Sequence, residues 1–379
     1  MIEKLRLLLE KNQFKGYDPY DALTSPVLSS LSLNNKYFRI LFIQLLKKSP
    51  INFRPVLFVR QEVNPKGLGL ILWGYVKLFR NNGDESLQEK ISQLLDLLDE
   101  VKTVTGSGHG WGYNFDWQSR AFFLPKFTPT TVNSAFIGHA LLDTFAVTGN
   151  EKALHLALPI ADFILTDLNR LAENDSICFS YTSLDEYFVH NANLLGASLL
   201  IRLYKFNKNE ELKNIAVKSL NYSMNHQQKD GSWFYAEKES SHWIDSFHTG
   251  FNLQAIRYFI DEGYGGVYED AFEKGVRFYA DHFFLPDGTP KYYHDKVYPI
   301  DIHSAAQAIA FFSGMGTAYH EFTEKILNWT LDNMRHPEGH FYFQKQRFYT
   351  NKIPYMRWSQ AWMFHALTEN LANNPATIS

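Results

Sequence analysis

One type of segment recurs along this sequence and limits what the chain can fold into. Five segments open with polar residues and continue as apolar runs rich in small side chains, without a continuous charged face. A helix of this kind is apolar nearly all round, so it must be buried, and its recurrence indicates a repeat architecture. The five segments begin at Thr131, His190, His248, His303 and Arg357.

A sixth buried helix is predicted nearer the N-terminus. There Asn64 would cap the helix and Pro65 would occupy its first turn, where the missing N–H costs nothing. In chain order, the first five buried helices are each followed by a short break and a more charged amphipathic helix. The pattern predicts outer helices that are wet on one face, such as those at 151–168, 209–224, 268–282 and 319–334.

The last buried helix ends near the C-terminus and has no outer partner after it. An early helix, Lys36 to Lys48, is the candidate that closes the ring. The predicted fold is then all-α, an (α/α)6 toroid of six inner and six outer helices. No linker-like stretch divides the chain, so a single domain is predicted over 1–379, with 1–35 as an extension packing on or beside the ring.

The connections that lead into inner helices share a second signature, a turn followed by alternating aromatic residues. This pattern predicts short β-hairpins in the long loops. All of them precede an inner helix and therefore lie on one rim, where the N-termini of the inner helices also point, so function is expected at that rim. The five loops contain Gly110–Tyr113, Phe179–Tyr181, Asp230–Tyr235, Asp287–Tyr292 and Glu338–Tyr342.

Polar and aromatic side chains gather where these loops meet the inner helices. Three junctions place a histidine at the same position with an aspartate upstream. The aspartates also suit helix caps and the aromatic residues suit packing on their own hairpins, so a structural role is the competing interpretation. The residues are Asp116 and Trp117; Asp185 and His190; Trp243, Asp245 and His248; Tyr292 and Tyr293; Asp301 and His303; and Tyr355, Arg357 and Trp358.

An aromatic pocket with a few convergent polar groups suits a sugar, which offers apolar C–H faces and many hydroxyls. Two chemistries remain open. In the first, a histidine or tyrosine moves a proton at the carbon beside a uronate carboxylate and Arg357 binds that carboxylate. In the second, two rim carboxylates hydrolyse a glycosidic bond. The acid/base candidates are Tyr292, Tyr293, His248 and His303; the hydrolytic carboxylates are Asp185, Asp245 and Asp301; the binding residues are Trp117, Asp116, His190, Trp243, Arg357, Trp358 and Tyr355.

Several other classes of function are not favoured. Lys and Arg number 37 against 40 Asp and Glu, without a basic stripe, so no nucleic-acid partner is expected. Cys178 is the only cysteine, which excludes an intramolecular disulfide. Neither a signal peptide nor a membrane span is evident, and a cytoplasmic location is expected. No glycine-rich phosphate loop is present, and no cofactor is expected. A metal held by His190, His248 and His303 is a weaker alternative, because the sequence lacks tight ligand spacing.

Seven strings carry a resemblance to known proteins. They are Gly16-Tyr-Asp-Pro-Tyr-Asp21, Asn64-Pro-Lys66, Trp111-Gly-Tyr-Asn-Phe-Asp-Trp-Gln118, Val189-His-Asn-Ala-Asn193, Trp243-Ile-Asp-Ser-Phe-His-Thr-Gly250, Tyr298-Pro-Ile-Asp-Ile-His303 and Tyr355-Met-Arg-Trp-Ser-Gln-Ala-Trp362. Together they resemble bacterial proteins associated with exopolysaccharide and surface-polysaccharide biosynthesis. The wider arrangement is similar to the six-hairpin (α/α)6 superfamily, which includes N-acylglucosamine 2-epimerase-like proteins, unsaturated glucuronyl hydrolases and glucuronyl C5-epimerases.

The resemblance implies a carbohydrate-active protein whose partner is a glycan or a sugar-containing precursor. Epimerisation or elimination at a uronate is the leading hypothesis. Glycoside hydrolysis and non-catalytic glycan binding within a biosynthetic complex are the alternatives. Gln228-Lys-Asp-Gly-Ser-Trp233 is also similar to a repeat of terpenoid cyclases, but the acidic motifs of those enzymes are absent. The sugar, the reaction and the oligomeric state stay open.

Overall fold

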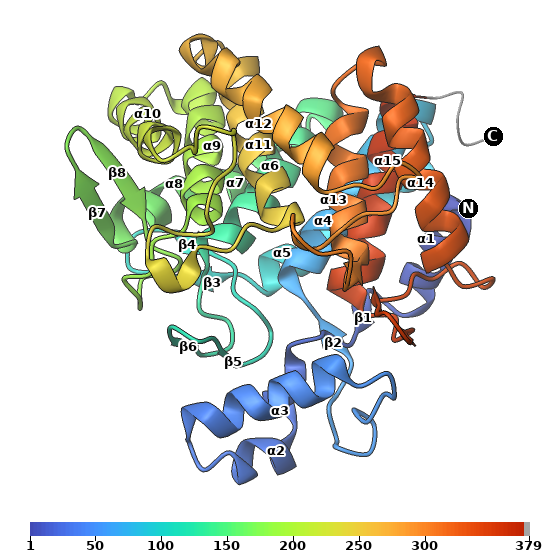
Figure 1. Cartoon of the computed structure of the whole chain (residues 1–379). Helices are drawn as coiled ribbons and strands as arrows, with labels where there is room; N and C mark the ends of the chain where they lie inside the picture. Colours follow the sequence, from blue (N-terminus) through green and yellow to red (C-terminus); the bar gives the residue numbers. More distant parts are fainter. Residues whose placement is uncertain (375–379) are drawn as a thin grey trace.

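Six inner helices form a closed ring in the computed structural model, which describes residues 1–374. Each inner helix packs against the next in the chain, and the last packs against the first. The ring predicted from the repeat is therefore confirmed (Figure 1). The inner helices are α4 (Pro65–Asn82), α6 (Thr131–Thr148), α9 (His190–Asn207), α11 (Ser246–Asp261), α13 (Ile302–Ser313) and α15 (Trp362–Asn373), the last preceded by the π-helical turn η6 (Met356–Ala361).

Five of the outer positions are filled by the helix that follows each inner helix, as the sequence predicts. The second of them is broken near Pro159 into two short helices and a π-helical turn. Each packs against the inner helix that precedes it. The outer elements are α5 (Ser86–Glu100), α7 (Glu151–Ala157) with α8 (Ile160–Asp162) and η2 (Phe163–Asp167), α10 (Glu210–Asn225), α12 (Glu269–His282) and α14 (His320–Met334).

The sixth outer position belongs to α1 (Ile2–Lys11), which packs against α15. The prediction that the helix at 36–48 closes the ring is wrong. The reason lies in the apolar faces of the two helices. Leu5 and Leu9 of α1 are fully buried in the main core, whereas Ile43 and Leu46 of the later helix pack into a small core of their own.

That later helix, α3 (Lys36–Lys48), lies outside the ring together with α2 (Pro26–Leu31) and the short turn η1 (Asp21–Thr24). Figure 1 shows α2 and α3 side by side beyond the rim, connected to α4 by the segment that follows α3. Ala22, Leu23 and Leu28 complete the small core that holds them together. The three elements form a cover at the rim where the long loops emerge.

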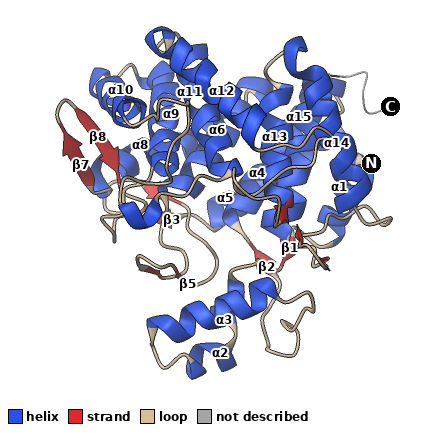
Figure 2. Cartoon of the chain, in the orientation of Figure 1, coloured by secondary structure: helices blue, strands red, loops and turns tan. Residues whose placement is uncertain are grey.

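The long loops carry short antiparallel strands, as Figure 2 shows in red among the blue helices. Two of the five predicted hairpin loops pair as sheets, around Gly110 and Phe179, and two others are reduced to single bridges, Phe284 with Pro290 and Arg335 with Phe341. The paired strands are β1 (Lys15–Gly16) with β2 (Glu62–Val63), β3 (Thr103–Val104) with β4 (His109–Gly110), β5 (Trp117–Gln118) with β6 (Phe123–Leu124), β7 (Arg170–Glu173) with β8 (Ser176–Phe179), and β10 (Gln344–Lys345) between β9 (Ile300–Asp301) and β11 (Thr350–Asn351).

The ends of the inner helices on the rim are set by short polar caps. The side chain of Asn64 accepts a hydrogen bond from the Gly67 amide and that of Thr130 from the Asn133 amide. Asp245 and Asp301 cap α11 and α13 in the same way. These caps aim the first turns of several helices at one space above the ring. No helix among residues 1–374 is long and apolar enough to cross a membrane.

Candidate functional site

A cavity of about 750 Å³ opens at the rim that the sequence singles out. It is bounded by the first turns of inner helices, by the long loops and by Ile40, Gln44 and Lys48 of α3. Its wall is largely aromatic, which suits a ligand with apolar faces. The aromatic lining includes Tyr20, Tyr113, Trp117, Tyr181, Tyr187, Tyr235, Trp243, Phe247, Tyr292, Tyr293 and Trp358.

Nine of the residues proposed from the sequence line this cavity. They come from the junctions of three inner helices, α11, α13 and α15, and from strand β5, although they are up to about 240 residues apart in the chain. The structure thus brings these predicted side chains together, while their roles stay predictions. They are Trp117, Trp243, Asp245, His248, Tyr292, Tyr293, His303, Arg357 and Trp358.

His248 and Asp245 form a hydrogen-bonded pair in the cavity wall. One carboxylate oxygen of Asp245 caps α11 by accepting from the His248 amide at 3.1 Å, and the other lies 2.7 Å from His248 Nδ1. The carboxylate is almost fully buried, but the His248 side chain is 23% exposed. Because Nδ1 is occupied, Nε2 is the nitrogen available to a ligand. A histidine oriented by a carboxylate in this way is suited to act as a general base.

His303 lies deeper and has a different environment. Its ring stacks on Phe247 with a centroid distance of 4.6 Å and contacts Trp362 at 4.4 Å. Within residues 1–374 neither ring nitrogen has a hydrogen-bond partner. Burial, together with the positive charges of Lys66 and Arg357, holds the pKa of His303 well below its usual value. His303 is therefore a neutral imidazole with free donor and acceptor capacity.

Lys66 is a charged cavity residue that sequence reasoning missed. It is 2% exposed, and its ammonium nitrogen lies 4.0 Å from the centroid of Phe136. The structure gives it neither an ion pair nor a hydrogen bond with any residue of 1–374, although burying an unpaired charge is costly. Burial, with the nearby Arg357, holds the pKa of Lys66 well below its usual value. The sequence does contain a signal for it. Lys66 lies two residues after the helix cap Asn64, just as the proposed site residue His303 lies two residues after the helix cap Asp301.

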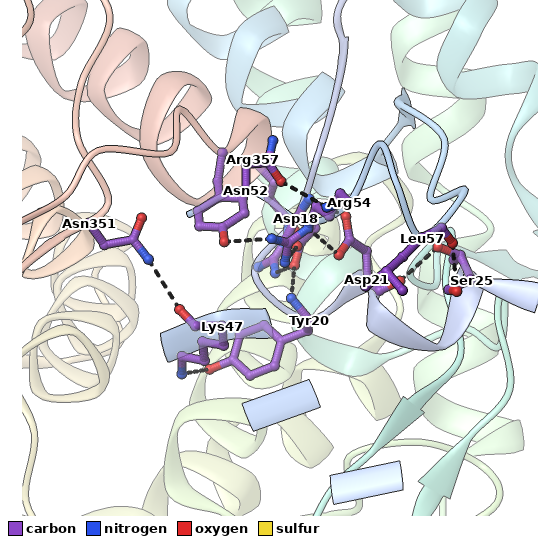
Figure 3. Close-up of polar contacts among 12 residues, drawn as sticks. Asp18, Tyr20, Asp21, Ser25, Lys47, Asn52, Arg54, Leu57, Asn351 and Arg357 are labelled. Atoms are coloured by element: carbon purple, nitrogen blue, oxygen red, sulfur yellow. Dashed lines mark hydrogen bonds and ion pairs between the residues drawn. The ribbon is translucent and has the colours of Figure 1, made fainter. Parts of the chain in front are cut away.

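Arg357, expected to bind a ligand carboxylate, already holds a carboxylate of the protein. Its Nε and Nη2 donate to the two oxygens of Asp18 at 2.6 and 2.8 Å, and both side chains are buried (Figure 3). Asp18 comes from the segment after α1, which sequence reasoning did not connect with the site. The charge of Arg357 is therefore balanced before any ligand binds.

A second buried ion pair ties the same segment to the ring. Arg54 donates through Nε to Asp21 at 2.6 Å, through Nη1 to the Tyr355 hydroxyl at 2.8 Å, and through Nη2 to the Asp18 carbonyl at 2.9 Å (Figure 3). These bonds link the cover formed by η1, α2 and α3 to the start of η6. Tyr355, proposed to contact a substrate, instead has its hydroxyl in this structural network.

Four other proposed residues lie outside the cavity lining, and the fold uses their polar atoms. Asp301 accepts from Trp358 Nε1 at 2.8 Å and from the His303 amide. Asp185 binds the amides of Thr182 and Tyr187 and so shapes its loop. Asp116 accepts a hydrogen bond from the Lys126 amide. His190 is hydrogen-bonded to Ser223 and Glu237.

A group of side chains that could ligate a metal ion lies away from the cavity lining. Within residues 1–374 one set of His, Cys, Asp or Glu side chains has its ligand atoms within 4.8 Å of one another, namely His336, Glu338 and His340 on the loop after α14. The alternative site at His190, His248 and His303 does not form such a cluster. Among residues 1–374, no three side chains of these types therefore form such a cluster in the cavity lining.

Comparison with known proteins identifies the fold. No protein-family model matches the sequence, and no curated protein matches it either. A cellobiose 2-epimerase from Bacillus thermoamylovorans superimposes with a TM-score of 0.61 and 15% identity over 82% of this chain and 90% of the epimerase. A family 88 glycosyl hydrolase from Bacteroides vulgatus superimposes with a TM-score of 0.58 and 10% identity, over 82% of this chain and 92% of the hydrolase. A polysaccharide lyase superimposes with a TM-score of 0.57 and 10% identity, over 82% of this chain and 91% of the lyase. With its closed ring of inner helices, the chain has the six-hairpin (α/α)6 toroid fold that these carbohydrate-active proteins share.

Proposed function

We propose that this protein acts on a carbohydrate and moves a proton at a sugar carbon beside a carboxylate, which leads to epimerisation or elimination. The observation that carries the proposal is the pairing of Asp245 with His248 in a cavity that also holds His303 and Lys66, whose side chains have no hydrogen-bond or ion-pair partner among residues 1–374. Epimerases, hydrolases and lyases among the structural neighbours support a carbohydrate ligand. The aromatic wall supports it independently.

In this proposal His248 is the base. Its Nε2 takes the proton from the carbon beside the carboxylate, and the imidazolium that forms is stabilised by Asp245. The electron pair of the broken C–H bond moves toward the carboxylate and makes an enolate-like species. A positive charge close to that carboxylate would stabilise the developing negative charge.

Lys66 is assigned this charge-stabilising role in place of Arg357. Its amine is not paired with a carboxylate, whereas the guanidinium of Arg357 is already held by Asp18. A substrate carboxylate would supply the missing partner and favour the protonated form of the amine. Binding should therefore be accompanied by uptake of a proton.

The second proton transfer decides the product. If His303, Tyr292 or Tyr293 delivers a proton to the opposite face of the same carbon, the sugar is epimerised. If the same group protonates a departing oxygen on the neighbouring carbon, the bond to that oxygen breaks and an unsaturated sugar is formed. All three side chains line the cavity. His303 and His248 both contact the ring of Phe247, so they approach the same part of the cavity.

Glycoside hydrolysis is the second candidate and needs two carboxyl groups flanking the bond. Asp245 and Asp295 are the carboxylates that line the cavity within residues 1–374, and Asp245 is bound to His248. Two of the three carboxylates expected from the sequence, Asp185 and Asp301, do not line it. The proton-transfer proposal therefore has the stronger support.

The test is NMR in deuterated water with a panel of uronate-containing oligosaccharides and their neutral counterparts. Deuterium on the carbon beside the carboxylate, or a new unsaturated sugar, supports the proposal. A new reducing end without deuterium on carbon would establish hydrolysis instead. Broadening of sugar signals without any chemical change would establish a binding protein. His248→Ala should abolish the deuterium exchange, because it removes the base.

A further inference from the structure

The exposed apolar side chains of this protein are concentrated on one small part of it. Among residues 1–374, 22 large hydrophobic side chains are exposed, and 11 of them fall between Val27 and Phe58. Isolated exposed apolar residues are ordinary on a protein surface, but a contiguous group marks an interaction site. This group, called here the α3 surface, includes Leu33, Tyr37, Leu41, Leu45, Val56 and Phe58.

Helix α3 presents three distinct faces. Ile43 and Leu46 are buried in the small core of the cover. Ile40, Gln44 and Lys48, spaced four residues apart, line the cavity. Tyr37, Leu41 and Leu45, also spaced four apart, form an outward stripe and are 77%, 47% and 56% exposed. The outward apolar stripe is therefore not explained by packing against any part of residues 1–374.

The charge of the same region is one-sided. Between Ala22 and Gln61 the chain has six basic residues and no acidic residue, although its overall net charge is −3. Arg54 is neutralised by Asp21, but none of the other five forms an ion pair with any residue of 1–374. Lys36, Lys48 and Arg60 are exposed. The α3 surface thus exposes apolar side chains on a segment whose positive charge is not balanced by acidic residues.

A distant loop adds to the same surface. The Tyr349 hydroxyl donates to the Lys48 carbonyl at 3.1 Å, and the Asn351 amide binds the carbonyls of Lys47 and Ser49. These bonds place the loop at the C-terminal end of α3. Within it, Phe348 is 88% exposed and the guanidinium of Arg347 lies over its ring. The loop repeats the combination of exposed apolar side chain and positive charge.

We propose that the α3 surface docks the protein on the surface of an anionic lipid bilayer. Amphipathic helices that lie in a membrane interface combine an apolar face with lysine and arginine around it, and anionic headgroups attract the positive charge. A second copy of this chain is a poorer occupant, because two positively charged surfaces of the same kind would repel each other. Docking needs no membrane span and is independent of the reaction in the cavity.

Docking in this orientation has a consequence for the substrate. Because α3 carries both the outward stripe and part of the cavity wall, the cavity mouth would lie beside the bilayer. A glycan carried on a membrane-anchored lipid could then reach the site without leaving the membrane. Figure 1 shows α2 and α3 as the part of the molecule that projects beyond the ring, where a flat surface can approach them.

The experiment is flotation of the full chain with vesicles of phosphatidylglycerol in phosphatidylcholine, compared with vesicles of phosphatidylcholine alone. We expect binding to the anionic vesicles that high salt weakens roughly tenfold or more. Tyr37→Ser/Leu45→Ser removes apolar contact, and Lys36→Glu/Arg60→Glu reverses two charges. Each double variant should bind roughly tenfold or more weakly.

The matched control is Val267→Ser/Lys274→Glu, which makes the same kinds of change near the start of α12. It should bind vesicles like the unaltered protein, and circular dichroism should show that every variant is folded. Absence of binding to anionic vesicles, or equal binding by all variants, would overturn the proposal. Light scattering that shows a dimer dissolved by the α3-surface variants, without vesicle binding, would also overturn it in favour of a second copy.

Discussion

Lys66 and His303 occupy matching positions on two inner helices, and their side chains contact the same two rings. Each lies two residues after its helix cap, Lys66 on α4 and His303 on α13. The Lys66 nitrogen is 5.1 and 5.3 Å from the ring centroids of Phe251 and Trp362, which are also 5.7 and 4.4 Å from the His303 ring. The floor of the cavity therefore holds the Lys66 amine and the His303 imidazole, which are packed on aromatic rings but have no hydrogen-bond partner among residues 1–374.

Replacing Lys66 by methionine should stabilise the protein. The substitution removes an unpartnered buried amine and keeps an unbranched chain that can pack on the same rings. We expect the free energy of unfolding to rise by about 1 kcal/mol or more, measured by denaturant unfolding. At the same time binding of an acidic sugar should be lost, because no amine remains to take up a proton and pair with the sugar carboxylate.

A matched control for this effect is Lys77→Met. Lys77 is also largely buried, but its ammonium lies 2.9 Å from a carboxylate oxygen of Glu369. Removing it leaves that carboxylate without its partner, so Lys77→Met should destabilise the protein. A loss of stability in Lys66→Met comparable to that in Lys77→Met would contradict the view that Lys66 is kept for binding and not for folding.

Asp245→Asn should separate the two roles of Asp245, which are to cap α11 and to orient and charge-stabilise His248. Asparagine caps helices as well as aspartate does, so α11 should keep its start and the stability should change little. The negative charge that stabilises the His248 imidazolium is lost, however, and turnover should fall by roughly 100-fold or more. The measurements are steady-state kinetics and thermal unfolding of the same preparation.

Asp185→Asn is the counterpart of that variant. The Asp185 carboxylate accepts from the Thr182 hydroxyl and from the amides of Thr182, Tyr181 and Tyr187, and an amide nitrogen cannot accept such bonds. We expect lower stability but ordinary turnover by the folded protein. If instead Asp185→Asn abolished turnover and Asp245→Asn did not, the assignment of the base would be wrong.

Much of this arrangement could be read from the sequence, because repetition and periodicity act locally. The starts of the inner helices, the amphipathic outer helices and the aromatic loops all follow from residue spacing. Asp245 and His248 could be proposed because they stand three residues apart at a helix start. Residue spacing could not show which polar side chains form hydrogen bonds within the protein and which stay free to bind a ligand. The bonds of Asp301 to Trp358 and of His190 to Glu237 depend on segments far apart in the chain.

The N-terminal region shows the same limit. Both α1 and α3 are short amphipathic helices in the sequence, and either could have closed the ring. The choice is made by tertiary contacts, including the hydrogen bond from the Tyr75 hydroxyl to Glu10 of α1 at 2.5 Å. Asp18 could not be linked to Arg357 from sequence because 339 residues separate them. A lone arginine therefore looked like a ligand clamp.

The Asp18–Arg357 pair should be costly to break from one side only. Asp18→Asn leaves the guanidinium buried without its countercharge, and we expect a loss of about 3 kcal/mol or more in the free energy of unfolding. Arg357→Met should cost a similar amount, because it strands Asp18. The double variant removes both charges and should recover part of the loss, so a double-mutant cycle by urea unfolding measures the coupling. Additive losses in the cycle would show that the two residues contribute independently.

Stability should decrease in mild acid because of histidines that are buried in the neutral form, and His365 offers the clearest case. It stacks on Trp73 at 4.5 Å, and burial lowers its pKa to about 4. Between about pH 6.5 and pH 4 the unfolded chain binds a proton that the folded chain does not, so the free energy of unfolding falls as the pH falls. The contribution of His365 over that window is about 3 kcal/mol.

His365→Phe keeps the stacked ring without the titrating group, so urea unfolding across this range should show a shallower pH dependence. Burial also lowers the pKa values of His139 and His303, so part of the slope should remain. An unchanged slope in His365→Phe would show that the acid sensitivity arises elsewhere.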